Sequence, residues 1–173
     1  FHVLAGIAWI GASFYFVWLD LSLEKPSAEN EAKGIKGQLS AIHGGGFYEV
    51  VKYKLGPQAM PANLHWFKWE AYTTWLTGFS LLTVMYYWGA NQYLIDPAKV
   101  DFSQMAAIGT SLLYLAGGFA IYEILLKSPL RNSNKGFAIV LFVILVFAAW
   151  LADQLFADRA AYIHVGALIG SIM

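Results

Sequence analysis

Two histidines, one near each end of the chain, have the chemistry of haem ligands. His2 lies in the apolar run FHVLAGIAWIGASFYF, and His164 lies in AYIHVGALIG. Two neutral imidazoles facing each other from different helices are the usual axial pair of a b-type haem in a helical bundle. Small neighbours such as Gly6 and Gly166 would leave room for a flat macrocycle. The alternatives are interfacial histidines without a ligand, or a zinc or copper site, which is disfavoured because only aspartates of the outer loops could supply a third ligand.

A third histidine, His43, opens the motif HGGGFYEVVKY. Glycine adopts backbone conformations closed to other residues, and consecutive amides can cradle an anion or a carbonyl-rich heterocycle. We therefore expect Gly44, Gly45, Gly46 and Tyr48 to bind a substrate and His43 to move a proton. The alternative is a mobile glycine hinge. An esterase oxyanion hole is excluded because the chain has no G-x-S-x-G sequence.

The fourth histidine opens LHWFKWEAYTTW. His65, Lys68 and Trp69 are spaced so that they share one face of a helix, and Trp66 and Glu70 share a neighbouring face. Charges that enter a membrane helix are costly and usually find a partner or a ligand. We expect Trp66, Lys68 and Trp69 to bind the substrate, and His65 and Glu70 to take part in proton transfer. The alternative is that Lys68 and Glu70 only extend to the membrane surface.

The composition indicates the kind of elements that hold these side chains. Of 173 residues, 58% are hydrophobic, 17% are aromatic and only 13% are charged, whereas a soluble domain carries about 25% charge. The 11 basic residues balance the 11 acidic ones, so no net field attracts a polyanion, and we expect no nucleic-acid partner. The absence of cysteine excludes disulfides, thiolate metal centres and a CxxCH haem attachment from this stretch.

Long charge-free runs predict an all-α fold, namely a polytopic transmembrane helical bundle. We expect a single integral-membrane domain over residues 1–173 with five spans. The expected spans are about 1–20, 65–90, 104–127, 136–157 and 160–173. The first and last runs look cut short, so we interpret the chain as part of a longer protein, truncated at both ends.

The basic residues predict an orientation in the inner (cytoplasmic) membrane. Nine of them belong to the connections 21–64 and 127–135 or to Lys68, against two in the alternate connections. The positive-inside rule places the loop 21–64 in the cytoplasm and the start of the chain in the periplasm. In this topology His2 and His164 lie near the outer surface, and His43 and His65 lie near the inner one. An electron path across the membrane would connect the two pairs.

Two further features concern packing of the expected helices. Tyr86 and Tyr87 belong to an aromatic cluster that we expect to form an interfacial belt. Gly109, Gly117 and Gly118 lie in one apolar run, where small residues let helices approach closely.

Six stretches carry a family resemblance over the whole length of the chain. They are HVLAGIAWIGASFYFVWLD, HGGGFYEVVKY, LHWFKWEAYTTWLTGFSLL, YLIDP, KSPL and AAYIHVGALIGSIM. In these the chain resembles the membrane domain of the bacterial cytochrome c-linked urate oxidase (urate hydroxylase) family. The resemblance implies about eight spans followed by a c-type cytochrome domain outside the membrane. It also implies purine catabolism, with urate oxidised toward 5-hydroxyisourate and electrons passed to the cytochrome.

The resemblance carries over to a defined set of residues. They are His2, His43, Gly44, Gly45, Gly46, His65, Trp66, Lys68, Trp69, Glu70 and His164. The expected cofactor is haem b on His2 and His164, with c-type haem only in a missing or separate domain. The expected partners are urate, the lipid bilayer and a c-type cytochrome.

Two other functions stay open from the sequence. One is a non-catalytic haem-, pigment- or lipid-binding subunit of a larger energy-transducing membrane complex. The other is a haem-dependent oxidase of porphyrinogens, which only the opening motif suggests.

Overall fold

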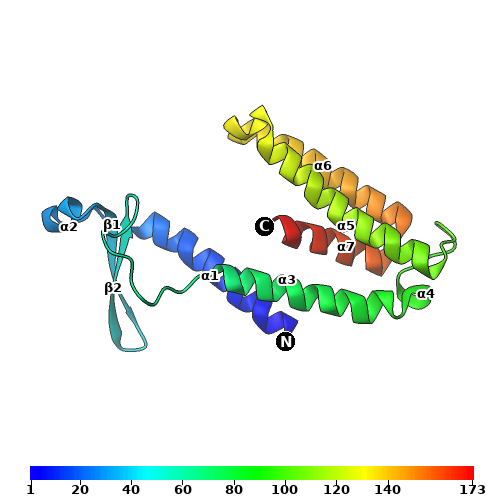
Figure 1. The fold of residues 1–173 in the computed structure, drawn as a ribbon, viewed down its shortest axis with the longest axis horizontal. Helices are drawn as coiled ribbons and strands as arrows, with labels where there is room; N and C mark the ends of the chain where they lie inside the picture. Colours follow the sequence, from blue (N-terminus) through cyan, green and yellow to red (C-terminus); the bar gives the residue numbers. More distant parts are fainter. The chain divides into compact units, whose positions relative to one another are not determined.

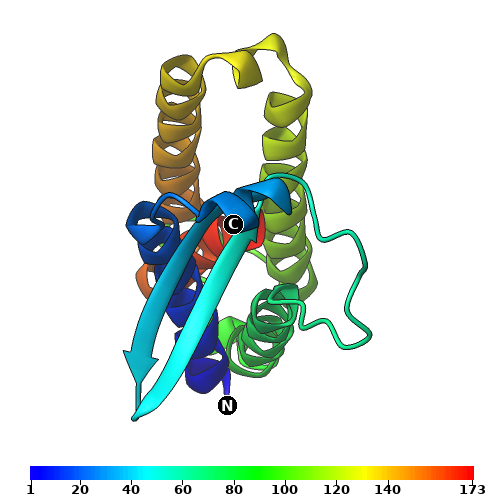
Figure 2. The ribbon, with the colours of Figure 1, turned by 90° about the vertical axis from the view of Figure 1, so that its left-hand side faces the viewer.

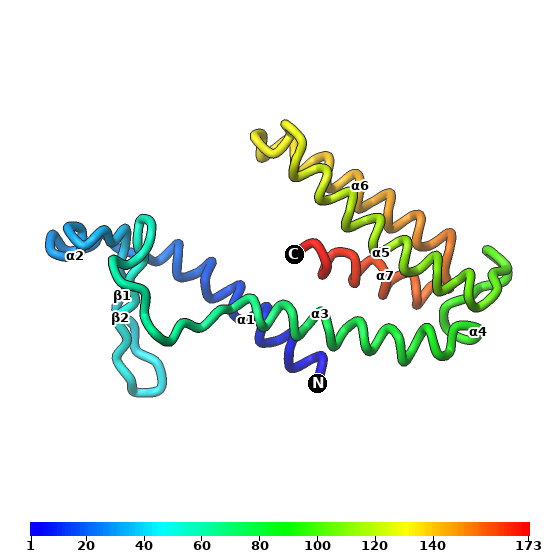
Figure 3. The backbone as a smooth tube through the Cα atoms, in the orientation of Figure 1, coloured from blue at the N-terminus to red at the C-terminus, as the bar shows by residue number.

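The computed structural model describes all 173 residues, and the chain divides into two compact units. The first unit comprises residues 3–74 with Phe1, and the second comprises residues 75–173 with His2. Figure 1 labels the helices and strands, and Figure 3 traces the same path as a tube.

The first unit begins with a long apolar helix, α1 (His2–Ser22). The run has no proline, and its first charge is Asp20. The helix ends where Leu23 takes an extended conformation with φ −64° and ψ 129°. Among its residues only Leu19 is buried, so nearly all of its apolar surface faces outward. A short acidic helix, α2 (Ala28–Ala32), follows and is capped by the Ser27 side chain.

A β-hairpin occupies the middle of the first unit. Strands β1 (Ile35–His43) and β2 (Gly46–Tyr53) pair antiparallel, and His43 lies opposite Gly46. The turn residues Gly44 and Gly45 have φ of 56° and 81°, the positive values that a two-residue hairpin turn of type I′ requires. The prediction of an all-α fold is therefore wrong, because the protein combines seven α-helices with a two-stranded sheet.

The second unit is helical. It contains the second half of α3 (Lys68–Leu82), a π-helical turn (Thr83–Tyr87), α4 (Ala90–Tyr93) and α5 (Gln104–Lys127). A 3₁₀ turn (Pro129–Asn132), α6 (Asn134–Leu155) and α7 (Asp158–Ile172) follow. The side chains of Ser103 and Ser133 accept hydrogen bonds from backbone N–H groups in the first turns of α5 and α6, which fixes where those helices start.

Helix α7 packs against both α5 and α6, and Figure 2 shows α5 and α6 standing apart from each other over their upper halves. At Gly118 a Cβ atom would lie 2.5 Å from Leu168 Cδ1 of α7, so this glycine permits the close approach that the sequence predicts. Gly109 and Gly117 have nothing within 4 Å of a built Cβ. The close-contact prediction is therefore confirmed for one glycine of the three.

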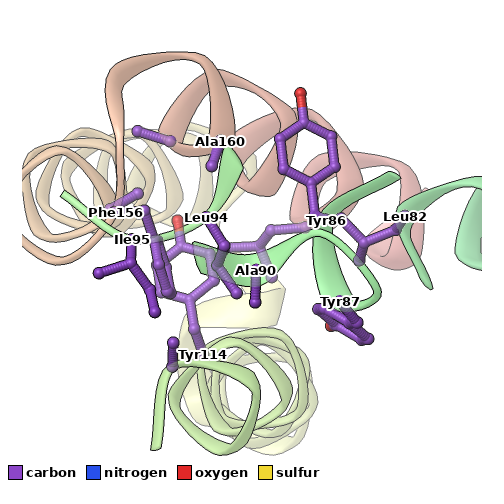
Figure 4. Close-up of a cluster of buried hydrophobic side chains, with 13 residues drawn as sticks. Leu82, Tyr86, Tyr87, Ala90, Leu94, Ile95, Tyr114, Phe156 and Ala160 are labelled. Carbon is purple, nitrogen blue, oxygen red and sulfur yellow. The ribbon is translucent and has the colours of Figure 1, made fainter. Parts of the chain in front are cut away.

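The core of the second unit forms where the π-helical turn, α4, α5 and α7 meet (Figure 4). Tyr86 and Tyr87 are buried there beside Leu94 and Phe156. The prediction of an interfacial belt is therefore wrong for these two tyrosines. The π-helical turn shifts the helical register by one residue at their position. Trp88, the next residue, is exposed.

Three helices, not five, are long and apolar enough to cross a membrane: α1, α5 and α6. The segment 65–90 does not form one helix, because α3 begins at Lys68 and gives way to the π-helical turn at Thr83. The helix α7 (Asp158–Ile172) is not among these three candidate spans. The five-span prediction is therefore wrong at its second and fifth segments.

Candidate functional site

The clearest polar constellation lies at the start of α3, within the first unit. His65 precedes the helix, and its Nε2 lies 2.9 Å from Oε1 of Glu70. The helix begins only at Lys68, so His65 does not share a helical face with Lys68 and Trp69 as predicted. The chain before the helix instead brings the imidazole back onto the first helical turn. The structure therefore places the two predicted proton-transfer residues in direct contact.

The surroundings of Glu70 favour its ionised carboxylate. Its own backbone N–H, and after it His65, hold the pKa of the Glu70 carboxyl below its ordinary value. Its second oxygen, Oε2, is buried and has no hydrogen-bond partner. An ionised carboxylate that accepts a hydrogen bond from Nε2–H fixes the tautomer of the imidazole and leaves Nδ1 of His65 free to accept a proton. Histidine held in this way by a carboxylate is suited to act as a general base.

Aromatic rings and one ammonium belong to the residues next to this pair in the sequence. Nζ of Lys68 lies 4.9 Å from the ring centroid of Trp66 and 5.6 Å from that of Trp69. Phe67 packs edge-on against the His65 ring, with centroids 4.7 Å apart. These rings are about half exposed. The cluster thus presents flat apolar faces and a positive charge, which suit a planar anionic ring.

The other predicted binding residues lie elsewhere in the first unit. His43 and the three glycines form the turn of the β-hairpin, and His43, Gly44 and Gly45 are exposed. The Tyr48 ring packs against Gly46, where a Cβ would lie 3.1 Å from Tyr48 Cε2. No hydrogen bond, ion pair or ring contact joins this turn to the His65–Glu70 pair. The structure therefore does not bring the two halves of the predicted substrate site together.

His164 is fully buried in the second unit and belongs to a hydrogen-bonded chain. Its Nδ1 lies 2.7 Å from the Ala160 carbonyl and its Nε2 lies 2.5 Å from Oγ of Ser111. Ser111 Oγ lies 2.7 Å from the hydroxyl of Tyr87. Because the carbonyl only accepts, Nδ1 donates to it, Ser111 donates to Nε2, and Tyr87 donates to Ser111. Both ring nitrogens of His164 and the hydroxyls of Ser111 and Tyr87 thus have hydrogen-bond partners.

His2 has different surroundings. Its Nδ1 lies 3.1 Å from Oγ1 of Thr77, and its ring packs on Gly78, where a Cβ would lie 2.9 Å from Cε1. The glycine leaves the space that the ring fills. The hydrogen bond fixes the ring through one nitrogen and leaves Nε2 as its second polar atom.

The predicted haem site can be tested on these contacts. Both ring nitrogens of His164 are engaged, and its faces meet Phe156, stacked at 4.3 Å, and Tyr114 at 6.0 Å between centroids. An axial ligand needs a nitrogen free for iron and open space in the ring plane. In this packing His164 offers neither, so His2 and His164 as placed do not fit a haem between them. No group of three or more His, Asp or Glu side chains is arranged to hold a metal ion either.

The comparison with protein families decides the broader identity. The family model described as urate oxidase N-terminal matches residues 1–173. The chain belongs to this family. No curated protein and no solved structure matches it. Membership of the urate oxidase N-terminal family supports, at a coarse level, an oxidoreductase-like enzyme of purine catabolism that acts on urate.

The sequence does not reveal the residues that join His164 in its hydrogen-bonded network. Ser111 and Tyr87 lie 53 and 77 positions before His164 in the sequence, so no local pattern links them to it. The hairpin does have a signal in the sequence, since β-branched and aromatic residues flank the glycines. We predict a ligand cradle from the same glycines, whereas the structure forms a tight turn there.

Proposed function

We propose that the protein takes part in membrane-bound oxidation of urate to 5-hydroxyisourate, and that the start of α3 holds the substrate. The observation that carries the proposal is the hydrogen bond between His65 and Glu70 beside the cationic aromatic cluster, in a chain of the urate oxidase N-terminal family. The reaction adds water to the urate ring and releases two electrons and two protons.

Each side chain of the cluster has a proposed role. The Lys68 ammonium attracts the anionic ring, and Trp66 and Trp69 provide flat surfaces against which it stacks. His65, oriented by Glu70, accepts a proton at Nδ1 as the ring loses electrons. Glu70 keeps the imidazole in one orientation and one tautomer through its hydrogen bond to Nε2.

We propose that the two electrons pass to c-type cytochrome, one electron to each haem. This acceptor rests on the resemblance to the cytochrome c-linked family. No step is assigned to a haem on His2 and His164, because the contacts of His164 leave no nitrogen for iron.

We also propose that the protein is embedded in the inner membrane. The support is the apolar outward surface of α1, α5 and α6. Five lysines follow α1 between residues 25 and 54, whereas residues 1–19 carry no charged side chain. The positive-inside rule then favours a periplasmic start and a cytoplasmic segment after Ser22, which would place His65 on the side of the lysines.

Urate-dependent reduction of an added c-type cytochrome by membranes that contain the full chain tests the function. Matched membranes lacking the protein, and a parallel assay with xanthine, serve as controls. We expect reduction with urate only, accompanied by loss of urate. Membranes rich in the protein that neither consume urate nor reduce the cytochrome would refute the proposal.

A further inference from the structure

The tip of the β-hairpin exposes large apolar side chains. Ile42 and Phe47 lie opposite each other on one face, with 71% and 75% of their surface exposed. Tyr48, on the other face, is 52% exposed. Soluble proteins seldom leave such a cluster uncovered without a binding role. The turn residues His43, Gly44 and Gly45 are exposed as well.

The base of the hairpin is joined firmly to the end of α1. Nζ of Lys52 lies 2.6 Å from Oδ1 of Asp20 in the last turns of that helix. Glu24 and Gln38 exchange backbone hydrogen bonds of 2.9 and 3.1 Å. Gly37 packs against Leu23, where a Cβ would lie 3.0 Å from Leu23 Cβ. The direction of the hairpin is thus set by the helix that precedes it.

That direction returns toward the side from which α1 comes. Figures 1 and 2 both show the hairpin running back obliquely from the C-terminal end of α1 instead of continuing beyond it. If α1 crosses the bilayer, the hairpin leaves the surface at Ser22 and its tip is directed back onto that surface. The apolar side chains then meet the boundary between lipid headgroups and acyl chains.

The charges at the base agree with an anionic lipid surface. A polar cleft at the junction is lined by Asp20, Leu23, Glu24, Lys25, Lys36, Gly37 and Lys52. Lys52 is neutralised by Asp20, whereas Lys25 and Lys36 form no ion pair. Lysines beside the end of a membrane helix attract phosphate headgroups.

We propose that the β1–β2 hairpin docks on the lipid surface of the same membrane that α1 crosses. Ile42, Phe47 and Tyr48 enter the headgroup–acyl boundary, and Lys25 and Lys36 face lipid phosphates at the base. The docking rests on the proposed membrane embedding and adds a second attachment to it. It also assigns the glycines of HGGG a conformational role in forming a tight apolar tip.

Residues 1–173 contain no cysteine, so a single cysteine introduced in this stretch can carry an environment-sensitive fluorophore. The full chain would be reconstituted in vesicles of phosphatidylcholine and phosphatidylglycerol, labelled at Phe47→Cys. Ala28→Cys in the exposed helix α2 is the aqueous control, and Ile7→Cys in α1 is the embedding control. Spin-labelled lipid and aqueous iodide serve as the two quenchers.

We expect spin-labelled lipid to quench the label at position 47 at least twofold more strongly than the label at position 28, with iodide showing the reverse order. A label at 47 as open to iodide as the label at 28, while position 7 is quenched by lipid, would overturn the docking and leave the embedding intact. Protection of position 47 from both quenchers would show contact with another copy of the chain and would also overturn it. Iodide access at position 7 would refute the embedding, and the docking with it.

The role of the polar cleft at the base is tested by removing its two lysines that form no ion pair. Replacing Lys25→Gln and Lys36→Gln together is expected to reduce lipid quenching at position 47 at least twofold in the phosphatidylglycerol vesicles and to change little in pure phosphatidylcholine. The pair Lys33→Gln and Lys54→Gln removes the same charge outside the cleft and is the matched control. Equal effects of the two pairs would contradict the assignment of the cleft.

Discussion

His65 hydrogen-bonds through Nε2 to Oε1 of Glu70 at 2.9 Å, across the first turn of α3. The bond joins a residue outside the helix to one inside it. It orients the imidazole at the point where Lys68 lies between two tryptophan rings. The first unit contains His65, Glu70, Lys68 and the two tryptophans. All residues of the proposed urate site therefore belong to one unit.

Glu70→Gln removes the carboxylate charge and keeps the side-chain volume. We expect kcat for urate oxidation to fall about tenfold, or ~1.4 kcal/mol in activation free energy, with little change in KM. The expected loss arises because the imidazole is no longer held in one orientation and tautomer by the carboxylate. Glu49→Gln, on the exposed hairpin, is the control. Equal kcat values for Glu70→Gln and Glu49→Gln would contradict this role of Glu70.

Lys68 is expected to affect binding more than chemistry. Lys68→Gln should raise KM for urate about tenfold, since the site loses a charge worth ~1 kcal/mol or more against an anion held near aromatic rings. Lys68→Arg should recover much of the affinity, because a guanidinium also stacks on tryptophan. Steady-state kinetics of the full chain in membranes would separate the two variants. Equal KM values for Gln, Arg and wild type would exclude Lys68 from the site.

Ser111 holds the buried chain of hydrogen bonds in the second unit together. Ser111→Ala should lower the free energy of unfolding by about 1–2 kcal/mol, because His164 and Tyr87 both lose their buried partner. Ser80→Ala removes an exposed helix serine that bonds only the Leu76 carbonyl and should change stability by less than about 0.5 kcal/mol. Thermal unfolding in detergent measures both. Equal losses of stability in the two variants would show that the buried hydrogen bonds of Ser111 contribute no more than an exposed serine does.

The ion pair between Lys99 and Asp158 makes stability depend on pH. Lys99 Nζ lies 2.5 Å from Asp158 Oδ1, and this hydrogen bond holds the pKa of the Asp158 carboxyl below its ordinary value. A lowered pKa in the folded state contributes stability above the unfolded pKa and loses it as pH falls. The thermal midpoint should therefore fall on acidification below about pH 4.

Asp158→Asn should reduce the part of that acid dependence that Asp158 contributes. Asp101→Asn, which removes an aspartate that forms no ion pair, is the control. Identical acid transitions in wild type and Asp158→Asn would contradict the assignment.

The sequence predicts the three apolar helices well, because charge-free runs of sufficient length leave few alternatives for α1, α5 and α6. The sequence does not predict the hairpin, because the glycines of HGGG can form either a ligand cradle or a tight turn. The structure shows the turn. The His65–Glu70 contact depends on where α3 begins, and Lys68 as the first helical residue cannot be read from periodicity. The partners of His164 come from distant helices, and only the packed fold brings them to it.

The most direct test of the proposed site is the rate of urate oxidation by the full chain carrying His65→Asn, measured with and without added imidazole. The account predicts a kcat at least about 100-fold below wild type, as expected for loss of a general base, with partial recovery when imidazole is supplied. Asn63→Ala, at a neighbouring exposed position, should retain the wild-type rate. A His65→Asn protein that oxidises urate at the wild-type rate would contradict the account.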